Sequence, residues 1–278
     1  RYKMSLLVFG HKNPDTDSIC SSIALSYLKN QLGFEAKPYA LGEVRKEAQF
    51  ALDYFKVSAP ELLTDVKGKD VILVDHNELA QTADGIEEAN IVEIVDHHKV
   101  EISTEVPISI RVMPVGCTCT IVYQMYKENN VEVPYEIAGL LLSAILSDTL
   151  LFKSPTTEMD KLACEELSKI ANVDMESYAM EMFKAGTSLD EYSIEEIVNM
   201  DFKEFDMSGK RVGIGQVFTL DIDSIFAKKD EFLSHINSTD YDMLVLAITD
   251  IIKEGSYLIY KAEDKIIAEA FSVDASQG

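Results

Sequence analysis

Short apolar runs alternate with segments of helical spacing over the first 186 residues. The runs, typical of buried parallel strands, are 6–9, 71–74, 91–95 and 108–112. Apolar residues recur at helical spacing in 19–28, 47–55, 119–126, 137–146 and 160–170. This alternation predicts an α/β domain over residues 1–186, with a mostly parallel sheet and helices on both faces.

The pattern loosens around residues 184–188, and we predict an interdomain linker at 187–191. The second predicted domain, 192–278, is smaller. We expect helices at 193–200 and 222–235, and strands at 211–218, 243–248, 257–260 and 266–271. The second domain is therefore expected to be α/β with a mixed sheet.

Polar clusters follow three of the predicted strands in the first domain. They are residues 11–17, Asp75 to Asn77, and Asp96 to His98. In an open parallel sheet, ligands bind beyond the carboxyl ends of the strands. We therefore expect these clusters to meet at one edge of the sheet, where Asp148, at the end of an apolar helix, can complete the group.

These residue types point to metal binding. Carboxylates and imidazoles are ligands of Mn, Co, Zn and Fe. Asp15 and Asp17 can serve two different ions, and Asp75 has two oxygens with which to bridge a pair. Two ions about 3.5–4 Å apart can hold a hydroxide and polarise a phosphoryl oxygen. Taken singly, each residue has an ordinary role as a loop residue or helix cap, and we expect His76 only to support the ligands or the fold.

Composition narrows the possible partners. The formal net charge of −23 argues against nucleic acid, whose phosphates require a basic surface. It leaves open a small anion that is bound through divalent cations. No apolar run approaches the ~18 residues that span a bilayer. The four cysteines form no C-x-x-C pair, which favours reduced thiols in the cytoplasm. We treat residues 1–3 as preceding a natural start at Met4.

Four motifs resemble the signatures of the DHH phosphoesterase superfamily. They are His-x-x-x-Asp-x-Asp at 11–17, Val-Asp-His-Asn-Glu at 74–78, Asp-His-His at 96–98 and Ser-Asp-Thr at 147–149. The stretch Gly-His-Lys-Asn-Pro-Asp-Thr-Asp-Ser at 10–18 and the second motif resemble family II inorganic pyrophosphatases more closely. The resemblance covers essentially the whole chain, and the motifs together are highly specific.

The resemblance implies roles for particular residues. One metal would be held by His11 and Asp15, the other by Asp17, His97 and Asp148, with Asp75 bridging the two. His98 would contact the substrate phosphate and donate a proton to the leaving group. Lys203, in the segment 201–205 of the second domain, would bind phosphate.

The resemblance also implies an activity. We expect hydrolysis of inorganic pyrophosphate to two orthophosphates, through in-line attack by a metal-bridging hydroxide and without a covalent phosphoenzyme. Two Mn²⁺ or Co²⁺ ions are expected per subunit, with Mg²⁺ accompanying the substrate. The second domain would close over the substrate. A cytoplasmic homodimer, joined through the first domain, is also implied.

One departure from the family concerns a basic Ser-Arg-Lys-Lys-Gln motif of the second domain, which grips pyrophosphate. The printed sequence stops at Gly278, where that motif should begin. We expect the natural protein to continue, and the printed chain alone to bind pyrophosphate weakly. A nucleotide-binding regulatory insert, carried by some relatives, would not fit in the short stretch 60–70.

Three other functions agree less well with the sequence. A nuclease or cyclic-dinucleotide phosphodiesterase of the same superfamily would carry a Gly-Gly-Gly-His motif in its second domain, which this sequence lacks. A regulatory metal-binding protein without turnover has only the missing basic motif in its favour. A mononuclear zinc hydrolase needs fewer ligands than the sequence provides.

Overall fold

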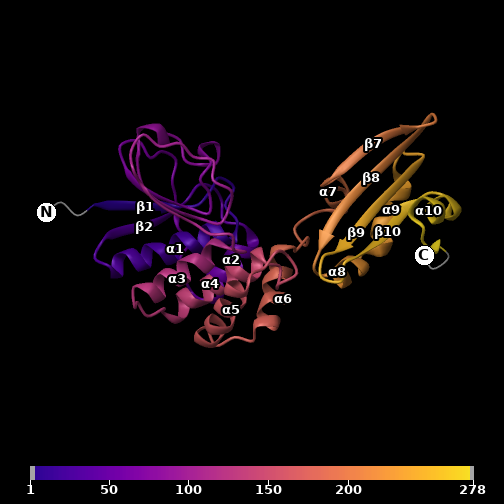
Figure 1. Ribbon diagram of the computed structural model, residues 1–278. Helices are drawn as coiled ribbons and strands as arrows, with labels where there is room; N and C mark the ends of the chain where they lie inside the picture. The colour runs from indigo at the N-terminus through magenta and orange to yellow at the C-terminus, as the bar shows by residue number, and fades with distance from the viewer. Residues whose placement is uncertain (1–3, 276–278) are drawn as a thin grey trace. The chain divides into compact units, whose positions relative to one another are not determined.

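The chain forms two compact units, residues 1–186 and 187–278 (Figure 1). The structure, a computed structural model, describes residues 4–275. Residues 276–278, after which the basic motif is expected, lie outside the described part. Residues 187–193, at the start of the second unit, belong to no helix or strand.

The first unit is built on a six-stranded sheet in which every pair of neighbouring strands is parallel. Its strands are β1 (Ser5–Phe9), β2 (Glu35–Ala40), β3 (Glu61–Leu62), β4 (Asp70–Val74), β5 (Asn90–Asp96) and β6 (Ser109–Val112). The order across the sheet is β3-β2-β1-β4-β5-β6, so the chain winds outwards in one direction from β1 and in the other from β4. Such a reversal opens a crevice at the carboxyl ends of β1 and β4, where α/β proteins bind ligands.

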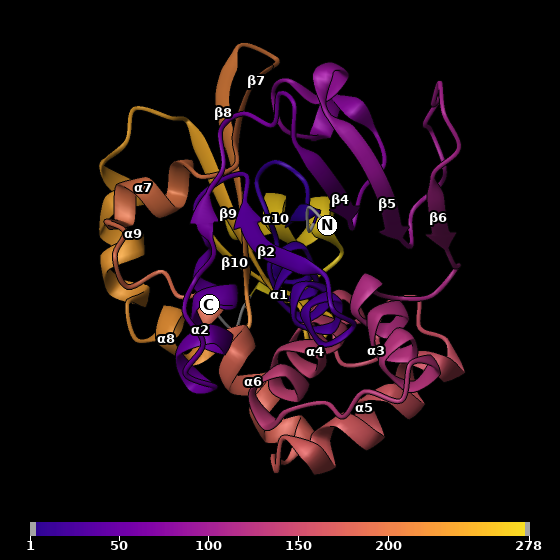
Figure 2. The same ribbon diagram turned by 90° about the vertical axis from the view of Figure 1, so that its left-hand side faces the viewer.

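The α-helices of the first unit lie on one face of this sheet (Figure 2). They are α1 (Thr16–Gln31), α2 (Lys46–Tyr54), α3 (Thr118–Glu128), α4 (Tyr135–Asp148), α5 (Glu158–Ile170) and α6 (Met175–Gly186). α1 and α3 pack on the strands, and α4 packs against α1. On the opposite face, Phe9 and Leu73 pack against Val66 and Ile86. That face is covered by loops and by two short 3-10 helices, η1 (Leu79–Gln81) and η2 (Ile86–Glu88), rather than by α-helices. The prediction of α-helices on both faces is therefore wrong, because the connections that follow β4 and β5 form loops and 3-10 turns instead.

Helix α1 begins at Thr16, after the loop 10–15 that follows β1, and a capping residue in the sequence marks this start. Asp15 is the N-cap, and its carboxylate accepts a hydrogen bond from the backbone N–H of Ser18 at 2.9 Å. The following turns contain the small residues Ser21, Ser22 and Ala24, whose side chains let the helix lie buried between the sheet and α4. The first turn of α1 is therefore held beside the carboxyl end of β1.

The second unit contains a mixed four-stranded sheet of order β10-β9-β8-β7. The strands are β7 (Phe202–Met207), β8 (Lys210–Thr219), β9 (Met243–Asp250) and β10 (Gly255–Lys261). β8 and β9 are parallel, whereas the two outer pairs are antiparallel. The helices are α7 (Ile194–Asn199), α8 (Ile222–Phe226), α9 (Lys229–Ser238) and α10 (Asp264–Phe271). Phe232 and Ile236 of α9 pack on Leu246 of β9 in the core of this unit.

The predicted α/β class and the mixed sheet of the second unit are confirmed, but three of its elements differ from expectation. The strand predicted at 266–271 is wrong, because these residues belong to helix α10. Ile267, Ala270 and Phe271 are spaced as one face of a helix. A short apolar run alone does not separate helix from strand. The helix predicted at 222–235 is broken into α8 and α9, and β7 was not predicted.

No helix within residues 4–275 combines the length and the apolar character that crossing a bilayer requires.

Replacing Phe232 with alanine should lower the free energy of unfolding of the second unit by about 3–5 kcal/mol, because it empties a fully buried site. Phe218→Ala, in the same unit, is the matched control, since Phe218 is 52% exposed. Urea denaturation followed by circular dichroism measures both. Equal losses for the two variants would contradict the assignment of the core.

Candidate metal centre

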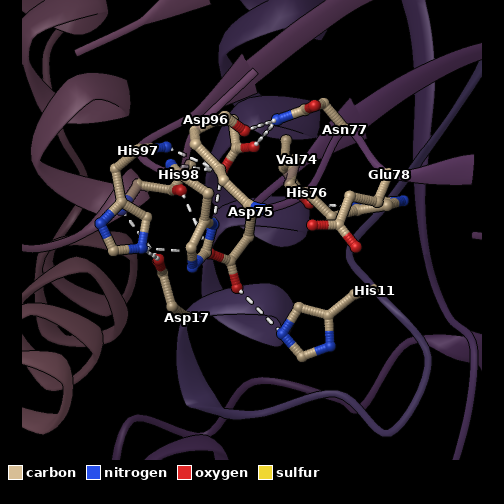
Figure 3. A network of polar contacts seen from close by, with 12 residues as sticks. His11, Asp17, Val74, Asp75, His76, Asn77, Glu78, Asp96, His97 and His98 are labelled. Carbon is tan, nitrogen blue, oxygen red and sulfur yellow. Dashed lines mark hydrogen bonds and ion pairs between the residues drawn. The ribbon is translucent and has the colours of Figure 1, made fainter. Parts of the chain in front are cut away.

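The predicted ligands come together at the carboxyl edge of the first sheet (Figure 3). His11 follows β1, Asp75 follows β4 and His97 follows β5. These three strands are neighbours in the sheet, so their ends are adjacent. Asp17 enters from the first turn of α1, and Asp148 is the last residue of α4. Four parts of the sequence, namely residues 11–17, Asp75, His97 and Asp148, thus contribute to one site.

One group of donors consists of His11, Asp15 and Asp75, whose ligand atoms lie within 4.8 Å of one another. His11 Nε2 is 3.5 Å from Asp15 Oδ2 and 3.4 Å from Asp75 Oδ2. These are nitrogen and oxygen donors converging on one point from two loops. A single divalent cation fits among them.

A second group consists of Asp17, His97 and Asp148, again within 4.8 Å of one another. His97 Nε2 is 3.7 Å from Asp148 Oδ2 and 3.9 Å from Asp17 Oδ2. The same nitrogen is 3.4 Å from Asp75 Oδ1. The two oxygens of Asp75 therefore face different histidines, and Figure 3 shows His11 and His97 on opposite sides of this carboxylate.

Asp75 adopts a backbone conformation that is rare for a residue with a side chain. Its φ of +61° is left-handed, which costs on the order of 1–3 kcal/mol outside glycine. Its N–H still donates to Val95 O at 2.9 Å, so the residue stays attached to β5. The side chain is 2% exposed. The residue that adopts this unfavourable conformation is thus the one whose carboxylate faces both His11 and His97.

Asp17 is wholly buried and is held by the N-terminus of α3. Its carboxylate accepts the backbone N–H groups of Thr118 at 2.8 Å and of Cys119 at 3.1 Å. The unpaired N–H groups and the dipole at a helix N-terminus stabilise a negative charge. The thiols of Cys117 and Cys119 also lie near Asp17, so these two cysteines belong to the surroundings of the centre.

His98 borders the centre and is oriented by Asp96. Asp96 Oδ1 contacts His98 Nδ1 at 2.7 Å, while Oδ2 accepts a hydrogen bond from Asn77 Nδ2 at 2.7 Å. His98 is 52% exposed and lines a cavity of about 200 Å³, together with His11 and Asp75. A small anion can therefore reach His98 beside the donor groups.

The remaining predicted residues lie apart from the donors. His76 is buried, and its Nδ1 contacts Val74 O at 2.7 Å. It joins none of the donor groups among the described residues. Lys203 is exposed on β7 in the second unit. Asp96 was not singled out as a positioning residue, although the Asp-His-His motif contains it.

Charge is tightly coupled in this cluster. Burial would lower the pKa of His11 and His97, but hydrogen bonds to the carboxylates raise these pKa values to about 11 and about 9. Burial would raise the pKa of Asp75, but the two histidines lower it. Burial and neighbouring carboxylates raise the pKa of Asp17 to about 7 and that of Asp148 well above its usual value.

These shifts have one common cause. The cluster holds more negative charge than its imidazoles balance, and protons supply the missing positive charge. Divalent cations supply it more effectively, because nitrogen and carboxylate oxygen donors without thiolate suit ions such as Mn²⁺. The donor set therefore fits a pair of such cations.

Comparison with known proteins agrees with this geometry. The model of the DHH family, N-terminal domain, matches residues 5–145, and that of the DHHA2 domain matches residues 180–278. The manganese-dependent inorganic pyrophosphatase of Bacillus subtilis is 47% identical over 96% of this chain and 90% of its own length. A Clostridium acetobutylicum protein, named as a probable enzyme of the same kind, is 48% identical over 97% of this chain and 89% of its own length.

The chain belongs to the family of manganese-dependent inorganic pyrophosphatases. A solved structure from Methanococcus jannaschii, assigned to the family II inorganic pyrophosphatases, matches with a TM-score of 0.68 and 41% identity. The match covers 96% of this chain and 91% of that one. An exopolyphosphatase-related protein from Bacteroides fragilis, 14% identical with a TM-score of 0.53, shares the fold. The family predicted from the four motifs is thus confirmed.

Binding of Mn²⁺ to this family member should release protons, about one or more per ion, because the imidazoles must lose theirs before they ligate. The pKa of His97, about 9, lies above neutral pH, so affinity for Mn²⁺ should rise as the pH increases towards that value. Calorimetric titration at pH 7.5 in buffers of different ionisation enthalpy measures the release. His235→Ala, on α9 of the second unit, should behave as wild type. Binding enthalpies that do not depend on the buffer would contradict the expectation.

Proposed function

We propose that the chain hydrolyses inorganic pyrophosphate to two orthophosphates at two divalent cations, Mn²⁺ or Co²⁺. The observation that carries this proposal is the position of Asp75, whose Oδ2 faces His11 and whose Oδ1 faces His97, each at 3.4 Å. A carboxylate between two imidazoles in this way has one oxygen for each of two ions. Membership of the pyrophosphatase family supports the choice of substrate.

Each cation would have its own ligands. His11 and Asp15 would hold one ion, Asp17, His97 and Asp148 the other, and Asp75 would bridge them. Two cations bound here would activate a water molecule for attack on phosphorus and would neutralise charge on the phosphoryl oxygens. Mg²⁺ would enter with pyrophosphate and reduce the charge of the substrate.

Side chains around the two cations would bind the substrate and transfer a proton. His98, held by Asp96 at 2.7 Å and half exposed, would contact a phosphate oxygen and donate a proton to the leaving orthophosphate. Lys203, exposed on β7, would bind the phosphate from the second unit. Attack would be a single in-line displacement, in which these groups hold the substrate and balance its charge. No side chain needs to form a bond to phosphorus.

The direct test is a phosphate-release assay with pyrophosphate in the presence and in the absence of Mn²⁺. We expect Mn²⁺-dependent release of two orthophosphates per pyrophosphate. A short oligonucleotide, tested in parallel, should not be cleaved, since a net charge of −23 repels a polynucleotide. Cleavage of the oligonucleotide with no release from pyrophosphate would favour a nuclease of the same superfamily instead.

Replacing Asp75 with alanine should abolish both the binding of two ions and nearly all turnover. Loss of a group on which both cations depend is expected to cost at least about 10³-fold in rate, comparable with the loss of a principal electrostatic group. Asp53→Ala is a suitable control, because Asp53 is exposed on α2 and accepts a hydrogen bond from Gln49 Nε2 at 2.8 Å, away from the donor groups. Wild-type turnover in Asp75→Ala would show that the bridging assignment is wrong.

The homodimer and the cytoplasmic location expected from the resemblance stay predictions. The exposed edge strands of the first sheet, β3 and β6, are compatible with association through the first unit. Light scattering on a size-exclusion column measures the mass in solution. A mass of twice the 31.0 kDa chain is the expected result.

A further inference from the structure

Two buried hydroxyl groups contact the two oxygens of Asp75, one each. Ser18 Oγ, on the first turn of α1, is 2.8 Å from Asp75 Oδ2. Thr118 Oγ1, on the first turn of α3, is 3.3 Å from Asp75 Oδ1. Both side chains are buried, with Ser18 1% exposed and Thr118 0%. Each oxygen of the carboxylate therefore has one hydroxyl group and one of the predicted histidine ligands as neighbours, and Oδ1 also lies 3.8 Å from His98 Nδ1.

The direction of the Ser18 hydrogen bonds is fixed by its surroundings. The backbone N–H of His11 donates to Ser18 Oγ at 3.3 Å, so the hydroxyl hydrogen is free to point to Asp75. An ionised carboxylate can only accept. Ser18 thereby links the backbone of one predicted ligand, His11, to the carboxylate of another.

Gly10 makes this placement of Ser18 sterically possible. A Cβ atom at residue 10 would lie 2.3 Å from Ser18 Cβ and 2.4 Å from Ser18 Oγ. Any larger residue would push α1 away from the end of β1. The glycine that precedes His11 thus allows the close approach of helix and strand on which the hydroxyl contact depends.

Thr118 acts on two carboxylates at once. Its backbone N–H donates to Asp17 at 2.8 Å, while its hydroxyl group reaches Asp75. Asp17 and Asp75 belong to the second donor group and to the bridge, respectively. A single residue therefore contacts both carboxylates.

We propose that Ser18 and Thr118 are positioning residues, whose hydroxyl groups fix the rotation of the Asp75 carboxylate so that each oxygen faces one cation. The proposal rests on the proposed function, since it concerns the pair of cations assigned there. A carboxylate oxygen can accept more than one contact, so a hydroxyl group on each oxygen leaves that oxygen able to bind a cation. Being neutral, the hydroxyl groups orient the carboxylate without cancelling the charge that attracts the metal. Groups that orient metal ligands in this way typically contribute about 10–100-fold in metal affinity or activity.

The two hydroxyl groups should act on different ions. Ser18 contacts the oxygen that faces His11, so loss of the Ser18 hydroxyl group should weaken the binding of the ion that His11 and Asp15 would hold. Thr118 contacts the oxygen that faces His97, so loss of the Thr118 hydroxyl group should weaken the binding of the ion that Asp17, His97 and Asp148 would hold. The longer Thr118 contact predicts a smaller effect. A purely structural role would lower stability and weaken both ions alike.

The experiment is a Mn²⁺ titration of the whole chain, followed by electron paramagnetic resonance and calorimetry. Ser18→Ala and Thr118→Val remove the hydroxyl groups, and Thr118→Ser retains one. Ser22→Ala is the matched control, since Ser22 is also buried on α1 and its hydroxyl group donates to Ser18 O at 2.6 Å, outside the donor groups. Thermal unfolding of each metal-free variant shows that it is folded.

We expect Ser18→Ala to keep one tight Mn²⁺ site and to weaken the other about 10–100-fold, so that signals of single ions replace those of coupled pairs. Thr118→Val should behave similarly with a smaller change, whereas Thr118→Ser and Ser22→Ala should match wild type. Should Ser18→Ala not fold, the comparison of Thr118→Val with Thr118→Ser decides the question.

Unchanged dissociation constants in Ser18→Ala and Thr118→Val would overturn the proposal, whatever the activity. An equal loss of Mn²⁺ affinity at both sites would also overturn it, and so would the same loss of affinity in Ser22→Ala. Either result would assign the hydroxyl groups a general structural role. A wild-type chain that binds two Mn²⁺ ions but releases no phosphate would overturn the proposed function alone. Failure of the wild-type chain to bind a pair of ions would refute both.

Discussion

Concentration of negative charge at one sheet edge is the constraint on which the rest of the structure depends. Asp15, Asp17, Asp75 and Asp148 converge there, and two of them are almost wholly buried. Like charges at such distances cannot all remain ionised without positive charge among them. The raised pKa values of His11 and His97 show the same demand being met by protons. A pair of divalent cations meets it more completely, and this links the folding of the site to metal binding.

The fold contributes groups that hold the carboxylates without neutralising them. Backbone N–H groups at the N-terminus of α3 donate to Asp17, and hydroxyl groups contact Asp75. Asp75 itself adopts a left-handed backbone conformation at the end of β4, beside the point where the strand order reverses. Such partners stabilise negative charge yet leave it available to a metal. The same arrangement explains how a chain with a net charge of −23 can act on an anionic substrate, since cations held by the protein would bind the phosphate.

Much of this centre could be predicted from the sequence, for a physical reason. Apolar runs that end in His or Asp place those residues at the carboxyl edge of a parallel sheet, and His11, Asp75 and His97 followed that rule. The supporting contacts could not be predicted in the same way. Thr118 meets Asp17 across 101 residues of sequence, and only tertiary packing brings α3 against α1. Similarly, α10 was predicted as a strand because a short apolar run fits either structure until packing decides.

Diffraction at the manganese absorption edge, from crystals of the protein grown with Mn²⁺, tests the central claim most directly. The account predicts two anomalous peaks about 3.5–4 Å apart, one on either side of the Asp75 carboxylate. The first peak should lie among His11 and Asp15, the second among Asp17, His97 and Asp148. A single peak, or ions bound elsewhere such as beside Cys117 and Cys119, would contradict it.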